Sequence, residues 1–230
     1  MKTLGLIGGT SWVSTADYYR IINQLVNERL GGLNSAKLFL YSLNLEEFKP
    51  SADPGKLLEM ESTLSAIALK LQTAGADCIM LCANTPHIVA DSVESKISIP
   101  LIHIAEVTAR EIKKQKLNKI GLLGTRVTME ENFYRDKLST HQIETIIPDA
   151  EDIEFIHTSI VTELGKGIFT EETKHKYLVI IEKLVRQGAE GIILGCTEIP
   201  MLINPAECSI PLFDTTAIHA TAAVKFALDM

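Results

Sequence analysis

Two cysteines stand where short apolar runs give way to polar residues. Cys82 ends the run "CIMLC" at 78–82, and Cys196 follows "GIILG" at 191–195 and precedes "TE". A thiolate is the reactive form of cysteine, and the N-terminus of a helix lowers the pKa of a thiol. A short helix predicted after Cys196 would favour its thiolate, whereas the charge of Glu198 would oppose it. The alternative for either cysteine is a buried and inert core position.

A second stretch, "GLIGGTS" at 5–11, could bind an anion. Its glycines follow an apolar run and precede a helix whose start is indicated by Ser14 and Asp17, in the S-x-x-D capping pattern. Backbone N–H groups at such a turn bind phosphate or carboxylate, and Thr10 and Ser11 add hydroxyl donors. The spacing is neither that of a dinucleotide-binding turn nor that of a P-loop, so a carboxylate fits at least as well as a nucleotide. The alternative is a tight turn without a ligand.

The elements that position these residues alternate between strands and helices. Apolar runs predict buried strands at 4–8, 37–43, 78–82, 120–124, 143–147 and 191–195, and apolar residues at three- and four-residue spacing predict a helix at 54–74. Alternation of this kind is typical of βαβ units with a parallel sheet, so the fold class is α/β.

An internal repeat divides the chain. "LGLIGGTS", "GADCIMLCANT" and "SIPLIHIAE" are echoed in order by "IGLLGTRVT", "GAEGIILGCTE" and "SIPLFDTTA", at offsets of about 115, 113 and 111 residues. We therefore predict two similar α/β lobes, 1–100 and 101–212, related by a pseudo-two-fold axis. A C-terminal helix within 213–230 would pack back on the first lobe. Ligands of such sheets bind beyond the carboxyl ends of the strands, which favours a site in a cleft between the lobes.

The same repeat bears on the two cysteines. It aligns Ala83 with Cys196 and Cys82 with Gly195. Side chains alternate across a strand, so Cys82 should face away from the site and belong to the core if Cys196 faces it. A bulge at the end of the strand would reverse this assignment.

Composition excludes several classes of function. The 230-residue chain carries a net charge of −7 without a basic patch, which disfavours nucleic-acid binding. No apolar run is long enough for a transmembrane helix, and the N-terminus does not match a signal peptide. The four cysteines and six histidines form neither a disulfide framework nor a zinc pattern, so we expect no metal. We expect a soluble cytoplasmic protein.

Four segments together resemble the aspartate/glutamate racemase family, and most closely its broad-specificity amino-acid racemase branch. They are "GGTSWVSTADYYRIIN", "ANTPHIVAD", "LLGTRVTME" and "GCTEIP". The resemblance implies an isomerase with an amino-acid substrate, two α/β lobes, no pyridoxal phosphate or other cofactor, and a homodimer. The apolar face of a helix at 14–30 could form the interface, or it could pack on its own sheet.

The resemblance also assigns roles to residues. Members of the family usually transfer the α-proton with two cysteines, one from each lobe, and Cys196 matches that of the second lobe. The first-lobe position is Ala83, which cannot transfer a proton, so Cys82, a water or a hydroxyl would have to replace it. The remaining matches are Asn84, Thr85 and Thr197 in carboxylate-binding turns, and Thr10, Ser11 and Thr125 in loops that close on the substrate. In some aspartate racemases a lysine near the "ELGKG" turn contacts the side-chain carboxylate of the substrate, and Lys166 lies one residue out of that register.

Three functions remain open at this level. The first is a racemase for aspartate- or glutamate-type substrates that is weak or works in one direction. The second is a single-cysteine decarboxylase of the same superfamily. The third is a catalytically degraded homologue that binds an amino acid.

Overall fold

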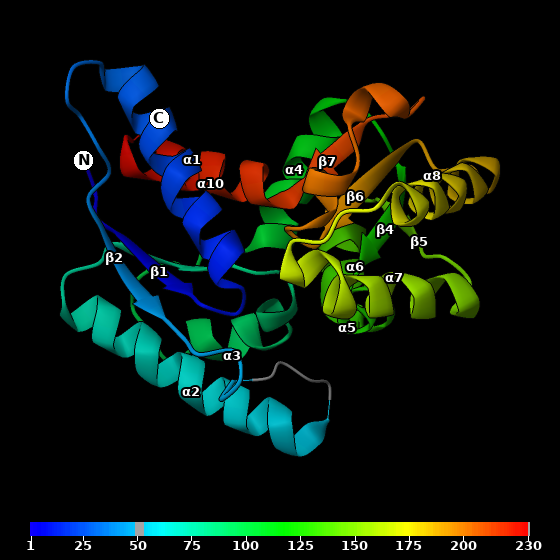
Figure 1. Ribbon diagram of the computed structural model, residues 1–230. Helices are drawn as coiled ribbons and strands as arrows, with labels where there is room; N and C mark the ends of the chain where they lie inside the picture. The colour runs from blue at the N-terminus through cyan, green and yellow to red at the C-terminus, as the bar shows by residue number, and fades with distance from the viewer. Residues whose placement is uncertain (49–52, 230) are drawn as a thin grey trace. The chain divides into compact units, whose positions relative to one another are not determined.

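The computed structural model describes residues 1–48 and 53–229, and the chain divides into two compact units (Figure 1). Unit 1 comprises Met1–Val107 and Thr216–Met230, and unit 2 comprises Thr108–Thr215. The sequence placed these divisions at 100 and 212. None of the helices in the described ranges is long and apolar enough to cross a membrane.

Unit 1 is built on a parallel sheet with the strand order β2-β1-β3. Its strands are β1 (Leu4–Gly8), β2 (Leu38–Ser42) and β3 (Cys78–Leu81). Its helical segments are α1 (Trp12–Leu30), α2 (Pro54–Thr73), η1 (Thr85–Val89), α3 (Ala90–Glu94), the start of α4 (Ile104–Lys114), and α10 (Thr215–Ala227). α2 agrees closely with the helix predicted at 54–74, and α10 is the predicted C-terminal helix.

The two faces of this sheet bury different side chains. Ile7, Ile79 and Leu81 pack with α2 and α3, whereas the alternate strand positions pack with α1 and α10. Figure 1 shows these two pairs of helices on opposite faces of the sheet. Within α1, Tyr18 and Ile22 are fully buried, so its apolar face packs on its own sheet. The sequence left open whether this face forms a dimer interface or packs on its own sheet, and the structure shows that it packs on the sheet.

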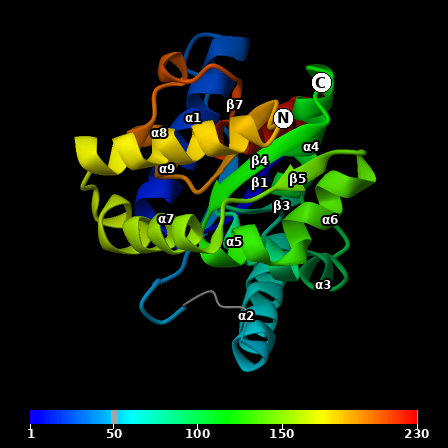
Figure 2. The ribbon, with the colours of Figure 1, turned by 90° about the vertical axis from the view of Figure 1, so that its right-hand side faces the viewer.

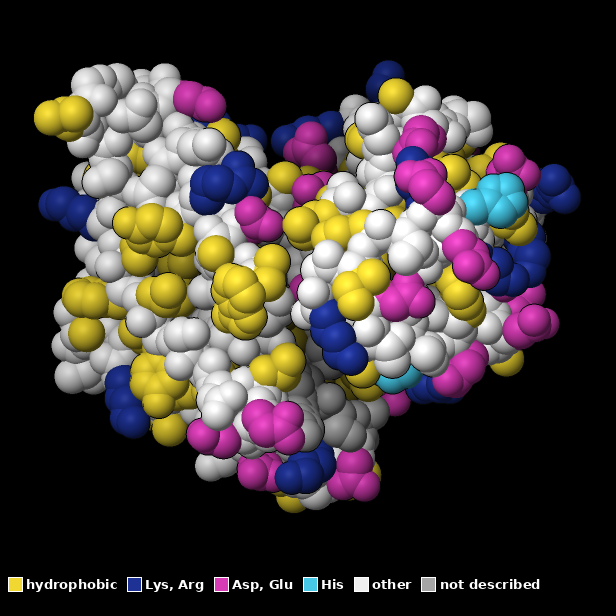
Figure 3. Space-filling model, in the orientation of Figure 1, with side chains coloured by type: hydrophobic (Ala, Val, Ile, Leu, Met, Phe, Trp, Pro, Cys, Tyr) yellow, Lys and Arg dark blue, Asp and Glu magenta, His cyan; other side chains and the backbone are white. Residues whose placement is uncertain are grey.

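The strand predicted at 37–43 is present as β2, but the prediction that it is buried is wrong. Four of the five residues of β2 are exposed, among them Phe39, Leu40 and Tyr41. β2 is an edge strand, because only β1 pairs with it among the described residues. Apolar composition indicated a strand but could not indicate that the strand lies at an edge. Figure 3 shows apolar side chains gathered on this face of unit 1.

Unit 2 repeats the arrangement with a parallel sheet of order β5-β4-β6-β7. Its strands are β4 (Lys119–Gly124), β5 (Glu144–Ile146), β6 (Gly191–Gly195) and β7 (Leu212–Asp214). Its helical segments are α5 (Arg126–Glu130), α6 (Asn132–Thr140), α7 (Ala150–Thr162), η2 (Leu164–Lys166), α8 (Glu171–Arg186), α9 (Ile199–Leu202) and η3 (Pro205–Glu207). Figure 2 shows the helices of this unit around β4 and β5.

The internal repeat is also visible in the strand pairing. Ile7 pairs with Leu81 in unit 1, and Leu123 pairs with Leu194 in unit 2. β7 was not predicted as a strand, and its counterpart in unit 1 is a single bridge between Ile79 and Leu101. The pairing registers therefore give the same alignment as the sequence repeat, with Ala83 as the counterpart of Cys196.

Candidate functional site

The turns after β4 and β6 bring one group of candidate residues together in unit 2. Gly124 and Gly195 are paired at the ends of these neighbouring strands. Thr125 follows the first, and Cys196 and Thr197 follow the second. Parallel strands end at the same edge of a sheet, so these residues share its carboxyl edge. All three side chains are half-buried.

Thr125 is fixed by its role at the start of α5. Its Oγ1 accepts a hydrogen bond from the N–H of Thr128 at 3.3 Å, as an N-cap residue does. The two hydroxyl oxygens lie 3.1 Å apart. Gly124 packs so closely on Thr128 that an added Cβ would lie 3.0 Å from its methyl group. The local fold therefore requires a glycine before Thr125.

The thiol of Cys196 contacts a buried carboxylate. Its Sγ donates to Oε2 of Glu198 at 3.0 Å, and the hydroxyl of Thr197 donates to the same oxygen at 2.7 Å. Glu198 is 5% exposed. The sequence placed Glu198 beside the thiol only as an opposing charge, because nothing in its pattern indicates where the carboxylate points.

This contact bears on the balance, left open by the sequence, between a helix N-terminus that favours the thiolate of Cys196 and the charge of Glu198 that opposes it. Burial, and then the charge and hydrogen bond of Glu198, raise the pKa of the Cys196 thiol well above its ordinary value. The backbone N–H groups of Thr197 and Glu198 lower this pKa, but they are outweighed. The helix that follows, α9, has only four residues, so its dipole is weak. At neutral pH Cys196 is therefore a thiol that donates to Oε2 of Glu198.

The glycine-rich turn after β1 forms the corresponding part of unit 1. Ser11 is the N-cap of α1, and its side chain accepts from the N–H of Ser14 at 3.3 Å. The predicted start of this helix at Ser14 and Asp17 is therefore wrong by one turn, because Ser11 is the capping residue. Gly9 has φ +85°, and an added Cβ would lie 2.0 Å from the carbonyl oxygen of Leu43.

Thr15 closes the same turn. Its Oγ1 accepts from the N–H of Gly9 at 2.8 Å and donates to the carbonyl of Ser11 at 2.8 Å. Thr10 lies inside this closed turn and is half-buried. The turn can therefore present its hydroxyl groups in a fixed geometry without any rearrangement of α1.

The segment after β3 carries the first-unit candidates Ala83, Asn84 and Thr85. Asn84 is 4% exposed, and the other two are half-buried. The hydroxyl of Ser14 donates to the carbonyl of Cys82 at 3.1 Å, and Nδ1 of His87 bonds to the carbonyl of Ala83 at 2.8 Å. Leu81 pairs with Ile7, so this turn and the glycine-rich turn lie at one edge of the sheet.

Cys82 lies in the core. It is 2% exposed and packs with Leu4, Leu6 and Tyr18. Burial raises the pKa of its thiol far above the ordinary range, and the same cause raises that of Cys78 to about 12. Burial in the core disfavours the thiolate of both residues.

Lys166 is the remaining candidate. It ends η2 and is exposed, and Gly167 follows it in the left-handed conformation at φ 75°. Its side chain is therefore exposed to solvent and is not fixed by packing. No set of three His, Cys, Asp or Glu side chains in the described ranges is placed to hold a metal ion.

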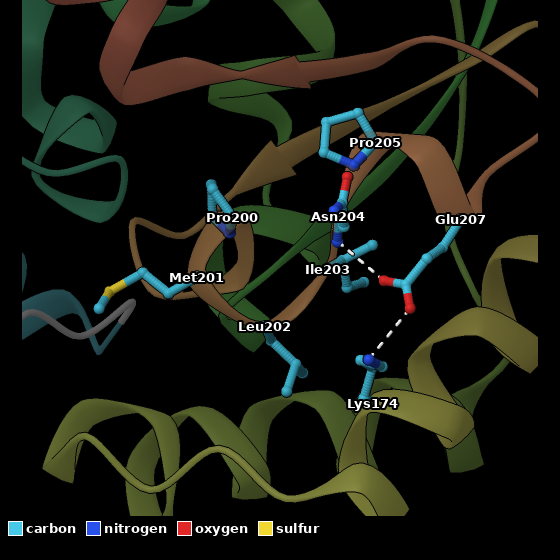
Figure 4. Close-up of a pocket in the computed structure, with 8 residues that line it drawn as sticks. All are labelled: Lys174, Pro200, Met201, Leu202, Ile203, Asn204, Pro205 and Glu207. Atoms are coloured by element: carbon cyan, nitrogen blue, oxygen red, sulfur yellow. Dashed lines mark hydrogen bonds and ion pairs between the residues drawn. The ribbon is translucent and has the colours of Figure 1, made fainter.

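A depression of about 400 Å³ is lined by residues of α9 and of the segment that follows it, together with Lys174 of α8 (Figure 4). None of the candidate residues lines it. Its charged groups neutralise each other, because Lys174 pairs with Glu207 at 3.0 Å, and Glu207 also accepts from the N–H of Asn204 at 3.0 Å. The depression presents no unused charge to a ligand, so the chemistry points to the carboxyl edges of the sheets instead.

Known proteins resemble the chain along nearly its whole length. The family model described as Asp/Glu/Hydantoin racemase matches residues 7–223. The broad specificity amino-acid racemase RacX of Bacillus subtilis is 26% identical over 167 residues, which are 73% of this chain and 72% of RacX. A Yersinia pestis protein assigned as an Asp/Glu racemase is 51% identical, with a TM-score of 0.93 over 99% of this chain and 100% of that one. An aspartate racemase homologue from Pyrococcus horikoshii is 34% identical, with a TM-score of 0.87 over 99% of this chain and 100% of that one.

Proposed function

The chain belongs to the Asp/Glu/Hydantoin racemase family and is an amino-acid racemase, and we propose that it moves the α-proton of an acidic amino acid with Cys196 as its acid–base group. The observation that carries this proposal is the contact of 3.0 Å between the thiol of Cys196 and Oε2 of Glu198. A racemase must remove a weakly acidic α-proton, and a thiol beside a carboxylate can change its protonation state to do so.

The proton steps follow from this pair. Glu198 takes the proton from Sγ, and the resulting thiolate removes the α-proton, so that Cys196 becomes a thiol again. The electron pair left on the α-carbon is delocalised into the α-carboxylate as an enediolate. A water or hydroxyl gives a proton to the opposite face and completes the inversion. Glu198 then returns its proton to the hydroxide or alkoxide that remains, which restores the starting pair of Cys196 and Glu198. Backbone N–H groups and hydroxyls stabilise such developing charge.

The α-carboxylate is assigned to the turns of unit 1. Thr10 and Ser11 belong to the turn after β1, and Asn84 and Thr85 belong to the turn after β3. Thr125 and Thr197 supply hydroxyls in unit 2, and Lys166 is the candidate for the side-chain carboxylate. Because Ala83 has no acid–base group, the proton on the opposite face comes from water or a hydroxyl. We therefore propose that one direction of the reaction is slow.

Isotope exchange tests this function. The protein is incubated in D2O with L- or D-aspartate and L- or D-glutamate separately, and loss of the α-hydrogen is followed by NMR. We expect exchange that Cys196→Ser abolishes, and that the matched variant Cys208→Ser leaves unchanged. Faster exchange from one enantiomer would identify Cys196 as the single strong base.

Two results would contradict the proposal. Binding of an amino acid without exchange would favour the degraded binding homologue. Release of CO2 from a malonate-type acid without exchange would favour the decarboxylase. Binding is detected separately as thermal stabilisation by the amino acid.

We also propose a homodimer that forms through unit 1. β2 is an edge strand with exposed Phe39, Leu40 and Tyr41, and exposed apolar edges promote pairing between chains. Leu40→Lys should shift the mass in light scattering from dimer to monomer, whereas Val161→Lys, at an exposed apolar residue of unit 2, should not. A monomeric wild-type protein would refute this. We place the protein in the cytoplasm, where its four free cysteines would stay reduced.

A further inference from the structure

Unit 1 contains a buried cluster of aromatic and imidazole rings that the proposed reaction does not use. His87, His219 and Tyr18 are each at most 2% exposed, and His103 is half-buried beside them. The ring of His87 lies 4.7 Å from that of His103 and 5.7 Å from that of His219, whose ring lies 5.6 Å from that of Tyr18. These four residues come from α1, η1, the segment before α4, and α10.

The hydrogen-bond partners fix the tautomer of the two buried histidines. The carbonyl of Ile102 can only accept, so Nε2 of His219 donates to it at 2.7 Å, and Nδ1 accepts from the hydroxyl of Tyr18 at 2.8 Å. In His87 the pattern is reversed. Its Nδ1 donates to the carbonyl of Ala83 at 2.8 Å, and its Nε2 accepts from the N–H of Ile104 at 3.2 Å. The ring of His87 is therefore neutral, because its Nε2 accepts. Burial lowers the pKa of His219 to about 4, so this ring is also neutral near pH 7 and its Nδ1 accepts from Tyr18.

These bonds tie the cluster to the turn after β3. Three successive carbonyls of this turn accept hydrogen bonds, those of Cys82, Ala83 and Asn84. Their donors are the hydroxyl of Ser14, Nδ1 of His87 and the backbone N–H of His87. A peptide unit is planar and trans, so a carbonyl held in one direction holds the following N–H in the opposite direction. The bond from His87 to Ala83 therefore fixes the direction of the Asn84 N–H.

We propose that His87 is a positioning residue for the carboxylate-binding turn. Its Nδ1–H holds the peptide unit between Ala83 and Asn84, so that the Asn84 N–H is oriented before the substrate arrives. The bond from the Ile104 N–H keeps the His87 ring from turning. The bonds of His219 to Tyr18 and to Ile102 hold the chain segment that carries Ile104. This role rests on the proposed function, because it assigns the substrate carboxylate to this turn.

Two substitutions at His87 separate its two bonds. His87→Asn retains an N–H near the place of Nδ1, so it can still donate to the carbonyl of Ala83. His87→Gln places its amide near Nε2, so it can accept from the Ile104 N–H but loses the donor to Ala83. Both variants remove the ring, so both carry a similar loss of packing. They differ in whether the hydrogen bond to the carbonyl of Ala83 is retained, and this is the bond that is proposed to orient the Asn84 N–H.

The experiment compares the two variants by kinetics and by NMR. We expect kcat/KM for the proposed α-hydrogen exchange to fall about tenfold in His87→Gln and to stay within about threefold of wild type in His87→Asn, since one hydrogen bond is worth roughly this factor. The Asn84 amide resonance should shift in His87→Gln and keep its wild-type position in His87→Asn. Equal changes in both variants would show a packing role and overturn the proposal.

The NMR measurements do not depend on catalysis. Long-range imidazole spectra of the wild-type protein should show the proton on Nδ1 of His87 and on Nε2 of His219, and the opposite tautomer of His87 would overturn the proposal. If the wild-type protein exchanges no amino acid, the proposed function fails. The Asn84 resonance in the two variants then still decides whether His87 orients this peptide unit.

Discussion

The two neutral histidines make the stability of unit 1 sensitive to acid. Burial lowers the pKa of His219 to about 4, and the nearby His103 adds to this effect. Burial, with His103 and His219, lowers the pKa of His87 as well. Tyr18 and His103 are the titratable side chains in ring contact with the pair. In the unfolded chain a histidine has a pKa of about 6.5.

The sign follows from proton linkage. Between about pH 6.5 and about pH 4 the unfolded chain binds more protons than the folded chain, so the free energy of unfolding falls as the pH falls. The contribution of His219 to the free energy of unfolding is fully present above the pKa of about 6.5 in the unfolded chain. It is lost as the pH falls to the pKa of about 4 in the folded chain. From about pH 6.5 to about pH 5 the loss is about 1.5 units at about 1.4 kcal/mol per unit, or about 2 kcal/mol for His219 alone. His87 contributes in the same direction.

Urea unfolding near pH 7 and near pH 5 measures this loss. The wild-type protein should lose about 2 kcal/mol more than His219→Gln between the two conditions, because glutamine does not titrate. His175→Gln, on the exposed side of α8, controls for the removal of an imidazole. The carboxylates with lowered pKa values, such as Glu190 and Glu207, lose their contribution only below their unfolded pKa of about 4.5, which lies outside this window. An equal loss in wild type and His219→Gln would refute the reasoning.

Three further predictions concern the proposed site. Glu198→Gln removes a buried charge, so the pKa of Cys196 should fall and its alkylation by iodoacetamide at mildly alkaline pH should accelerate at least about tenfold; an unchanged rate would contradict this. Ala83→Cys should raise α-hydrogen exchange of the slower enantiomer by about a hundredfold, the lower end for an added acid–base group; no gain would contradict it. Ser11→Ala should cost about 1 kcal/mol of unfolding free energy in thermal or urea unfolding, because it removes the N-cap of α1.

The sequence was sufficient for most of the fold because the strands are short apolar runs between periodic helices. β1, β3, β4 and β6 were found within one residue of their observed ends. The repeat also gave the correct correspondence of Ala83 with Cys196, since both sheets use the same pairing register. The burial of β2 was mispredicted because an edge strand and a central strand can have equally apolar sequences.

Two features of the site could not be predicted from the sequence for a geometric reason. The bond between Cys196 and Glu198 depends on the direction of a side chain after β6, and a one-residue change in the turn would move the carboxylate away. The cluster of His87, His103 and His219 joins residues far apart in the chain, and their spacing matches no motif. The tautomers of such a cluster follow from the hydrogen-bond partners, which only a three-dimensional structure supplies.

The two units have the same arrangement of central strands but differ in the turn that follows β3 in unit 1 and β6 in unit 2. In unit 2 this turn reads Cys196, Thr197, Glu198, and a thiol and a carboxylate are in contact. In unit 1 the aligned residues are Ala83, Asn84 and Thr85, and the carbonyls of this turn are tied by Ser14 and His87. The first arrangement suits proton transfer, and the second suits a rigid set of N–H donors. A cysteine introduced at position 83 would have Thr85 where Cys196 has Glu198, and therefore no carboxylate to take its proton. This asymmetry is the physical reason to expect only a partial gain from Ala83→Cys, and a larger one when Thr85→Glu is added.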